Sequence, residues 1–363
     1  MMQAQCCSTL TTDHSIQRIA VFRALQLGDL LLAIPALRSL RAGFPQSEIT
    51  LIALPWASDF SHRFAHLIDR FVSFPGYPGI DEAGCSQSDL QSFFQEQCAY
   101  SYDLGIQMHG SGLTSNGFVV GLGARLTAGF YEQHRPHGIA WALPYPDTAS
   151  EIERNLSLVH GLGCPDTGAH LEYPMGDVDQ REAKHLLSDV LPSLGRLVGI
   201  HPGSRPPARR WPAERFAMVA DVLARSQGAT IVLTGSQDEA ATVRSVIDRM
   251  QFPALNLAGR TTLGRLAAVI KRLDLFLSND TGPAHLAEAV GTPTVRIFGP
   301  ADPRRWAPLD AGNHRSLYAA VPCSPCPYTD CPIDHRCMTR IQPGAVTRAT
   351  QDLLLSEAVA CNA

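Results

Sequence analysis

The sequence contains no long hydrophobic run. No stretch of about 18 uncharged apolar residues occurs, so we expect no helix that spans a bilayer. The N-terminal segment MMQAQCCSTLTTDHSIQR also lacks the apolar stretch of a secretory signal. A cytoplasmic location is therefore the expectation. No long basic amphipathic helix is present either, which limits any expected membrane contact to a peripheral one.

An excess of positive charge is lacking as well. The chain carries 30 Lys and Arg against 34 Asp and Glu, which gives a formal net charge of −4. General nucleic-acid binders have a diffuse basic surface, so we expect no nucleic-acid partner. A local basic pocket for phosphate remains compatible with this balance.

The chain shows no internal repeat and no low-complexity segment, and its composition is that of a soluble globular protein. Hydrophobic residues make up 45% and charged residues 18% of the 363 residues. At roughly 100–200 residues per domain, this length predicts two domains with a core each. Pro, Gly and acidic residues are frequent between about residues 144 and 176. We therefore expect a linker there, with one domain over 1–176 and another over 177–363.

Short apolar strands alternate with helical patterns in both halves. We expect strands at residues 19–23, 49–54 and 102–107 and a helix at 30–41 in the first half. In the second half, strands are expected at 197–201, 229–234, 254–258, 273–278 and 293–298, and helices at 213–226, 238–250, 263–272 and 283–290. This alternation predicts an α/β fold with doubly wound parallel sheets. Ligands of such sheets bind at the carboxyl ends of the strands, so we expect the chemistry in the loops after Arg23, His201, Thr234 and Ser278.

The loop after Ser278 has the features of an anion site. Asp280 or Thr281 can cap the following helix, and Gly282 allows a ligand to approach the free backbone N–H groups. A diphosphate fits such a site, and His285 in the first helical turn is near enough to reach it. The alternatives are a well-capped helix with no ligand and a partly buried structural histidine.

Charged residues in two further loops suit a nucleotide. Arg205, Arg209 and Arg210 crowd a proline-stiffened loop, HPGSRPPARRWP, where fixed guanidinium groups match phosphate oxygens. Glu239 follows the strand after it and could accept hydrogen bonds from ribose hydroxyls. The alternatives are a solvated basic loop and a charge that favours a helix N-terminus. In the first half, Asp29 starts a helix, either as its N-cap or as a general base for an acceptor hydroxyl.

Taken in order, these motifs resemble glycosyltransferase family 9, the heptosyltransferase family. The matching blocks are a strand followed by GD and a helix with PAL, then HPG with a basic residue ahead of WP, then TG beside an acidic residue, and finally NDTGPAHLAEAVGTPTV followed by FGP. They cover most of the chain, and the last block is the most specific. The resemblance implies the GT-B fold, in which two Rossmann-like domains bind a nucleotide sugar in an interdomain cleft.

The resemblance also implies roles for individual residues. Asp29 matches the catalytic base, Glu239 the ribose contact, and Arg209 the basic residue, usually lysine, that holds the donor phosphates. Arginine keeps the charge of that lysine and changes its hydrogen-bond geometry. The remaining donor-binding residues are Ser204, Asp280, Thr281, Gly282 and His285. Gly28 and His109 are expected to contact the acceptor or the donor sugar, although a plain loop around His109 is the alternative.

The implied reaction is inverting transfer of a sugar, a heptose from ADP-heptose, to a lipopolysaccharide core or a similar glycan. The domain over 1–176 would bind this acceptor and the domain over 177–363 the nucleotide sugar, and closure of the two would bring the base to the anomeric carbon. A lipid-anchored acceptor implies work at the cytoplasmic face of the inner membrane. The alternatives are a nucleotide-sugar epimerase or hydrolase of the same fold and a non-catalytic nucleotide-sugar-binding protein.

Two motifs raise the question of a metal, which GT-B enzymes do not normally need for transfer, so we expect no required cofactor. Cys323, Cys326, Cys331 and Cys337 form C-x2-C-x4-C-x5-C with His335 beside them, and thiolates at such spacing could bind a structural zinc ion or an iron–sulfur cluster. Packed thiols or a disulfide are the alternatives, and many family sequences have a related segment. A D-x-D triplet at 177–179 is like the metal site of the other glycosyltransferase fold. It lies in the expected linker, so we interpret it as solvated charge.

Overall fold

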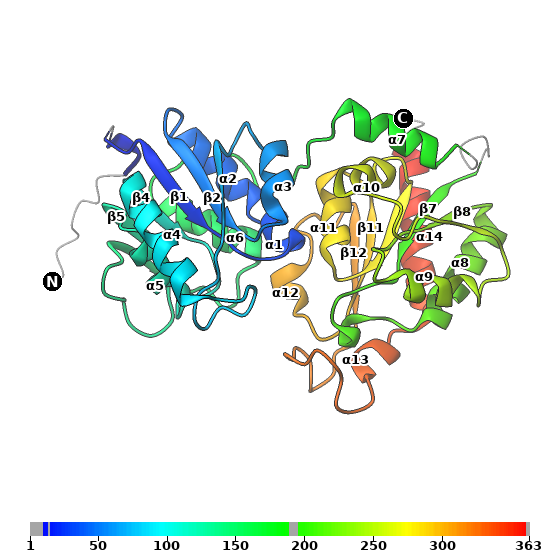
Figure 1. Cartoon of the computed structure of the whole chain (residues 1–363). Coiled ribbons are helices and arrows are strands. Elements are labelled where there is room, and N and C mark those ends of the chain that lie inside the picture. The colour runs from blue at the N-terminus through cyan, green and yellow to red at the C-terminus, as the bar shows by residue number, and fades with distance from the viewer. Residues whose placement is uncertain (1–9, 14, 189–194, 361–363) are drawn as a thin grey trace. The chain divides into compact units, whose positions relative to one another are not determined.

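The computed structural model describes residues 10–13, 15–188 and 195–360, and these divide into two compact units on either side of the bond between His170 and Leu171. The polar N-terminal residues, Cys6 and Cys7 among them, lie outside the described residues. Each unit is built around one six-stranded parallel sheet (Figure 1). The expected α/β fold with two doubly wound sheets is therefore confirmed.

The sheet of the first unit has the strand order β3-β2-β1-β4-β5-β6. Its strands are β1 (Arg18–Phe22), β2 (Glu48–Ala53), β3 (Arg70–Ser73), β4 (Leu104–Gln107), β5 (Leu126–Tyr131) and β6 (Trp141–Pro144). Phe22, the last residue of β1, is in register with Ile52 on one side and Gln107 on the other. The carboxyl ends of the central strands therefore lie together at one edge of the sheet.

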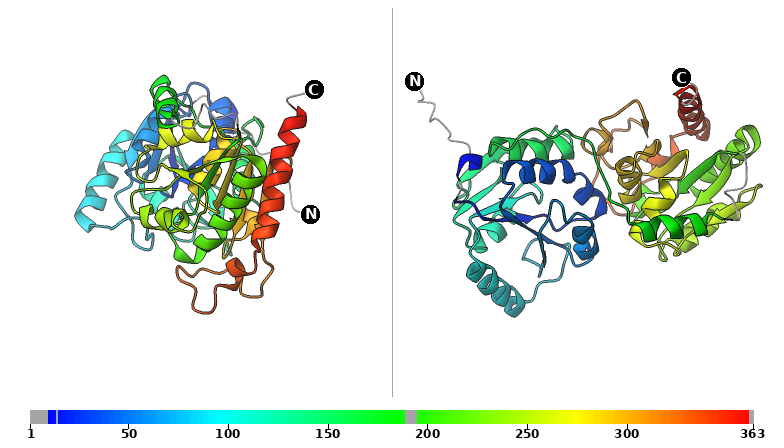
Figure 2. Two further views of the ribbon diagram at one scale, coloured as in Figure 1. Left: turned by 90° about the vertical axis from the view of Figure 1, so that its right-hand side faces the viewer. Right: turned by 90° about the horizontal axis from the view of Figure 1, so that it is seen from above.

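Helices cover both faces of this sheet (Figures 1 and 2). They are α1 (Leu27–Leu31), α2 (Ile34–Gly43), α3 (Ala57–Arg63), α4 (Gln87–Tyr100), α5 (Ser115–Gly121) and α6 (Glu151–Gly161), and a short 3-10 turn, η1 (Leu10–Thr12), precedes β1. Helix α2 packs against α6, and an aromatic core of Phe22, Phe74, Phe93 and Phe118 joins α4 and α5 to the sheet. Burial of these rings supplies the hydrophobic stabilisation of the unit.

The sheet of the second unit has the strand order β12-β11-β10-β7-β8-β9, which is the order of the first sheet when it is read from β9. Its strands are β7 (Leu197–His201), β8 (Thr230–Leu233), β9 (Ala254–Asn256), β10 (Leu275–Asn279), β11 (Thr294–Phe298) and β12 (His314–Tyr318). The helices are α7 (Asp177–Leu186), α8 (Ala213–Gln227), α9 (Ala240–Ile247), α10 (Leu263–Ile270), α11 (Gly282–Ala289), α12 (Pro303–Trp306), α13 (Arg336–Thr339) and α14 (Pro343–Ala360), with a 3-10 turn η2 (Pro207–Arg209). Helix α8 packs against α9 and α14, and α10 packs against α7 and α11.

Two expectations about elements are wrong. The helix expected over 30–41 is two helices, because Pro35 has no N–H to donate to the carbonyl of Leu31 and α2 therefore begins anew at Ile34. Strand β6 ends at Pro144, where the expected linker begins, α6 occupies the middle of the linker, and the D-x-D triplet at its end forms the first turn of α7. There the Asp179 carboxylate is buried and accepts a hydrogen bond from the backbone N–H of Gly176 at 3.0 Å, so this aspartate is not solvated.

None of the helices built from the described residues combines the length and the apolar character that crossing a membrane requires.

Candidate active site

Each sheet has a topological switch point, where the chain stops adding strands on one side of the unit's first strand and continues on the other side. In the first unit this point lies between β1 and β4, and in the second between β7 and β10. In open α/β sheets, the loops diverge at such a point to opposite faces and leave a crevice at the carboxyl ends of the strands, where ligands bind. Asp29 follows β1, Arg209 follows β7 and Asp280 follows β10, so the residues predicted from the sequence lie in the loops of these two crevices.

The turn between β10 and α11 leaves the start of the helix open to a ligand. Thr281 occupies the N-cap position of α11, and its side chain accepts no hydrogen bond from the first turn. Instead, its Oγ1 lies 3.2 Å from the Ser278 hydroxyl and 3.3 Å from the Asn279 carbonyl oxygen. The Thr281 side chain therefore does not cap the helix. Backbone N–H groups at a helix start that the N-cap side chain leaves unbonded favour an anion.

A chain of charged groups runs from this turn into the interior of the second unit. Arg209 Nη1 lies 3.6 Å from Asp280 Oδ2, and His285 Nε2 lies 3.8 Å from Asp280 Oδ1. Behind His285, Arg296 Nη1 lies 3.0 Å from His285 Nδ1. Because a guanidinium group can only donate, Nδ1 of His285 accepts this bond and its ring proton is on Nε2, which faces Asp280.

His285 is held in its neutral form. Burial lowers its pKa well below the usual value of 6.5, and the positive charges of Arg296 and Arg209 lower it further. The residue therefore offers one N–H donor and no charge near neutral pH. Positive charge at the turn comes from Arg209, whose side chain keeps 37% of its exposure while that of Asp280 keeps 4%.

Arg296 is a residue of this chain of contacts that the sequence analysis missed. It lies in the middle of β11 and is fully buried, where it forms an ion pair with Glu288 and donates to the Ala284 carbonyl at 2.9 Å. A buried cation is costly unless it is paired, so an arginine within the apolar run PTVRIF is the signal that could have revealed it.

The loop after β7 is fastened to the end of β10 by Asn279. Its side-chain amide donates to the carbonyls of Pro202 and Gly203 at 2.9 and 3.2 Å, and it accepts from the Trp211 N–H at 3.0 Å. Ser204 is buried in this loop. The structure also separates two of the loop's arginines, because Arg209 approaches Asp280 whereas Arg210 Nε donates back to the Ser204 carbonyl at 2.8 Å.

Glu239 lies against the backbone of the same loop. A Cβ atom placed on Gly203 would be 2.3 Å from the Glu239 carboxyl carbon, so a side chain at position 203 would displace this carboxylate. The carboxylate accepts from the Ser236 N–H at 2.9 Å and lies 3.6 Å from His201 Nε2. Burial lowers the pKa of His201, and the charge of Glu239 opposes that effect. Glu239 is thus fixed beside the crevice, where it can accept hydroxyl donors.

In the first unit, Asp29 lies in the first turn of the short helix α1, next to the buried Gly28. Its Oδ2 accepts from the Gln26 N–H at 3.3 Å, its Oδ1 lies 4.0 Å from Arg23 Nη2, and its side chain retains 19% exposure. The expectation that Asp29 is the N-cap is therefore wrong, because Gln26 holds that position and Asp29, the third residue of α1, accepts the N–H of the N-cap residue. The carboxylate is also open enough to meet a ligand.

His109 lies after β4 on the other side of the same crevice. Its ring stacks on Phe22 with centroids 5.0 Å apart, and its Nε2 lies 3.8 Å from Glu82 Oε2. Burial, with a smaller contribution from Arg23, lowers its pKa to about 4. His109 is a buried neutral imidazole at pH 7, with only a small exposed fraction for a sugar contact.

The four C-terminal cysteines are free thiols. Burial raises the pKa of Cys337, and the neighbouring thiols Cys326, Cys331 and Cys323 raise it further. The Cys331 sulfur accepts a hydrogen bond from the His335 N–H at 3.2 Å, whereas the His335 ring lies 2.6 Å from the Ala208 carbonyl oxygen. Across the described part of the chain, no three His, Cys, Asp or Glu side chains are arranged to hold a metal ion.

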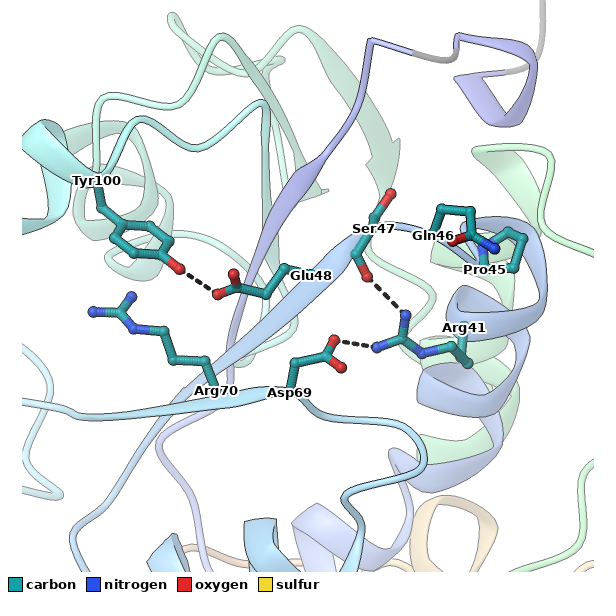
Figure 3. Close-up of a pocket in the computed structure, with 8 residues that line it drawn as sticks. All are labelled: Arg41, Pro45, Gln46, Ser47, Glu48, Asp69, Arg70 and Tyr100. Atoms are coloured by element: carbon teal, nitrogen blue, oxygen red, sulfur yellow. Dashed lines mark hydrogen bonds and ion pairs between the residues drawn. The ribbon is translucent and has the colours of Figure 1, made fainter.

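A surface hollow of about 530 Å³ lies at the other end of the first sheet (Figure 3). Its charged side chains satisfy one another, because Arg41 is paired with Asp69 and Glu48 accepts a hydrogen bond from Tyr100. The hollow is lined by Arg41, Pro45, Gln46, Ser47, Glu48, Asp69, Arg70 and Tyr100. Glu48 and Arg70 begin β2 and β3, so this is the amino edge of the sheet and we assign no site to it.

A family model and a curated relative both relate this chain to heptosyltransferases. The family model described as "Glycosyltransferase family 9 (heptosyltransferase)" matches residues 90–336, more than half of the chain. Lipopolysaccharide heptosyltransferase 3 of Escherichia coli (strain K12) is 28% identical to this chain over 311 residues, which are 80% of this chain and 87% of that protein.

Solved structures share the two-sheet architecture. The glycosyl transferase family 9 protein from Veillonella parvula DSM 2008 has a TM-score of 0.78 and 25% identity, over 94% of this chain and 98% of that one. An E. coli heptosyltransferase with ADP-2-deoxy-2-fluoro heptose has a TM-score of 0.64 and 18% identity, over 93% of this chain and 99% of that one. At this level of identity, the second comparison concerns the fold alone.

Proposed function

Because the chain belongs to glycosyltransferase family 9, we propose that it transfers a heptose from an ADP-linked donor to a lipopolysaccharide core or a similar glycan. The chain is a glycosyltransferase, and its two parallel six-stranded sheets are those of the GT-B fold. The observation that carries the heptose and the lipopolysaccharide acceptor is the relationship to a lipopolysaccharide heptosyltransferase over 87% of that protein's length.

The second unit is proposed to bind the nucleotide sugar. Arg209 and the start of α11 at Gly282, which the Thr281 side chain does not cap, would provide a cation and N–H donors for the diphosphate. Glu239 offers its carboxylate to the ribose hydroxyls. Asp280 and the Nε2–H of His285 would orient the sugar and its phosphate, and Ser204 would line the same loop.

Asp29 is the proposed general base in the first unit, with Gly28 and His109 as acceptor or sugar contacts. The acceptor oxygen forms a bond to the anomeric carbon while the bond from that carbon to the diphosphate breaks, and the proton of the acceptor hydroxyl passes to Asp29. ADP leaves with its negative charge, which Arg209 and the start of α11 stabilise. The anomeric configuration is inverted in this single displacement, and the proposal requires no metal ion.

The site of action is proposed to be the cytoplasmic face of the membrane that holds the lipid-anchored acceptor. The support is the lipopolysaccharide named as the acceptor class of the relative. Attachment to that membrane would be peripheral and weak.

Transfer is tested by incubating the purified chain with ADP-heptose and a lipopolysaccharide acceptor that lacks heptose. We expect ADP release that depends on the acceptor, and a gain of one heptose in its mass. ADP or free sugar formed without the acceptor would instead indicate a hydrolase or epimerase, and donor binding without turnover a binding protein.

The base is tested with Asp29→Ala. This variant should bind ADP-heptose nearly as well as the wild type and lose at least about 100-fold in kcat, the range of general-base effects. Unchanged transfer by Asp29→Ala would exclude the base assignment while leaving the transferase function in place.

A further inference from the structure

Arg23 is a buried cation at the carboxyl end of β1. It retains 2% exposure although it follows the strand directly, in a loop of the candidate site. Its guanidinium group reaches three other segments, because it donates to the Met108 carbonyl after β4, to Asn155 Oδ1 in α6 at 3.3 Å, and to the backbone of α1. One side chain thus joins the ends of β1 and β4 to two helices.

The contact with α1 is made at Asp29 itself. Arg23 Nε donates to the Asp29 carbonyl oxygen at 2.7 Å, and Arg23 Nη2 lies 4.0 Å from the Asp29 carboxylate. Helix α1 is only five residues long, which is too short to be stable on its own. The position of the Asp29 carboxylate therefore depends on groups outside the helix, and Arg23 provides two of these contacts.

The opposite side of the guanidinium group faces α6. Arg23 Nη2 lies 3.1 Å from Glu151 Oε2, and the other oxygen of Glu151 is paired with Arg154. Asn155 donates to the Leu32 carbonyl just after α1 at 3.4 Å, so α6 braces the same segment. Because the Glu151 carboxylate is paired with two arginines, it neutralises the Arg23 guanidinium group only in part. The remaining positive charge of Arg23 can act on Asp29.

We propose that Arg23 is a positioning residue for Asp29 and that Glu151 sets how much positive charge Arg23 presents to that carboxylate. The inference rests on the proposed role of Asp29 as base. A buried cation is expensive to desolvate, and replacing such ion pairs by apolar groups often costs no stability. Its place beside the candidate base therefore points to a role in that base's geometry and charge.

The charged and titratable groups around Asp29 define the expected pH dependence. Among them are Arg23, Glu151, which is paired with Arg23 and Arg154, and beyond Arg23 also His109, which is uncharged near neutral pH because burial lowers its pKa to about 4. A stronger positive field makes a carboxylate easier to ionise and a weaker base, and a weaker field does the opposite. Changes at Arg23 and Glu151 should therefore move the acidic limb of the kcat profile in opposite directions.

The test compares kcat against pH for three variants. Glu151→Gln should move the acidic limb to lower pH by about 1 unit, and the double variant Arg23→Met/Glu151→Met should move it to higher pH by a similar amount. Arg23→Lys keeps the charge and loses the fork of hydrogen bonds, so its limb should stay in place while kcat falls roughly tenfold or more. ADP binding should be unchanged in all three.

Arg41→Met is the matched control. Arg41 is an arginine of the same unit that donates to the carbonyls of Ser47 at 2.7 Å and Leu67 at 3.2 Å and is paired with Asp69, at the amino edge of the sheet (Figure 3). Its loss should lower the melting temperature and leave the limb unmoved. A limb that stays fixed, or moves in one direction for both Glu151→Gln and the double variant, would overturn the inference. Transfer by Asp29→Ala would instead show that the proposed base is wrong.

Discussion

Arg209 and Arg210 are adjacent arginines in the loop after β7, and they have different surroundings. Arg209 is paired with Asp280 at 3.6 Å and keeps 37% of its side-chain exposure, whereas Arg210 is hydrogen-bonded to the carbonyl of Ser204. A diphosphate can compete with Asp280 for Arg209, because a phosphate offers more charge and a matching pair of oxygens. The difference between neighbours allows a controlled test of the proposed phosphate contact.

Arg209→Ala should weaken ADP binding roughly 10- to 100-fold, which corresponds to about 1.4–2.8 kcal/mol. Arg210→Ala removes the same charge one residue away and should change the dissociation constant much less. Calorimetric titration of ADP into both variants gives the comparison at low and moderate salt. Equal losses in the two variants would mean that only the general positive charge of the loop matters.

Buried histidines give this protein a predicted acid sensitivity. Burial is the main cause that lowers the pKa of His109 in the first unit and of His314 in the second to about 4, with Arg23 and Arg296 adding to it. An unfolded chain would take up these protons near the ordinary value of 6.5. Above pH 6.5 these histidines therefore do not reduce the free energy of unfolding. As the pH falls from 6.5 towards 4, the free energy of unfolding decreases.

Each of these two histidines should reduce the free energy of unfolding by up to about 1.4 kcal/mol per pH unit in that interval. Urea unfolding at pH 7, 6 and 5 measures the loss. His314→Asn should flatten the dependence, whereas His62→Asn at an exposed position of α3 serves as the control. A midpoint that does not change between pH 7 and 5 would contradict the prediction.

Among the elements, β11 and α11 are joined by a buried ion pair. Arg296 in β11 is fully buried and is paired with Glu288 of α11, and the same guanidinium group donates to His285. Arg296→Met should destabilise the chain by about 3–5 kcal/mol, because it leaves a carboxylate in the interior without its partner. Thermal or urea unfolding measures this loss.

The double variant Arg296→Met/Glu288→Met should recover most of the lost stability, since two apolar groups then replace the pair. In both variants Nδ1 of His285 loses its donor, so the imidazole becomes easier to protonate and ADP binding should become stronger at pH 6 than at pH 8. If the double variant were as unstable as the single one, the buried charge would not be the cause of the loss.

The strands differ in how readily the sequence predicts them. Strands β7, β10 and β11 are buried at every position and consist mainly of apolar residues, so composition alone locates them to within about two residues. Strands β3, β6 and β12 are largely half-buried, and residues such as Arg70 and Arg315 interrupt their pattern. Strand β5 is hidden for another reason, because Thr127, Ala128 and Gly129 carry little hydrophobic signal.

The candidate site divides in a similar way. Loop motifs predict Asp29, Arg209, Glu239 and the turn at Asp280, because they depend on local backbone and on residue type. Arg23 and Glu151 could not be assigned from local patterns, since these two partners lie 128 residues apart in the chain. Tertiary contacts of this kind are visible only in the structure.

On the scale of the whole molecule, each of the two units has its own hydrophobic core and its own proposed ligand. The first core gathers around Phe22 and Phe118, and the second joins α8, α9 and α14 to the sheet of β7 and β10. Every proposed nucleotide contact belongs to the second unit, and the proposed base belongs to the first. A chain with two cores need not unfold in one step.

Scanning calorimetry should therefore show two unfolding components, and ADP should raise the temperature of only one. At a free ADP concentration of 100 times the dissociation constant, the bound unit gains about 2.7 kcal/mol. Hydrogen exchange assigns the components, with increased protection expected in β7, β10 and α11 and none in β1 or β4. UDP and GDP at the same concentration serve as controls for recognition of the nucleobase. A shift of both components, or added protection only around Asp29, would place the nucleotide outside the second unit and would contradict the proposed donor site.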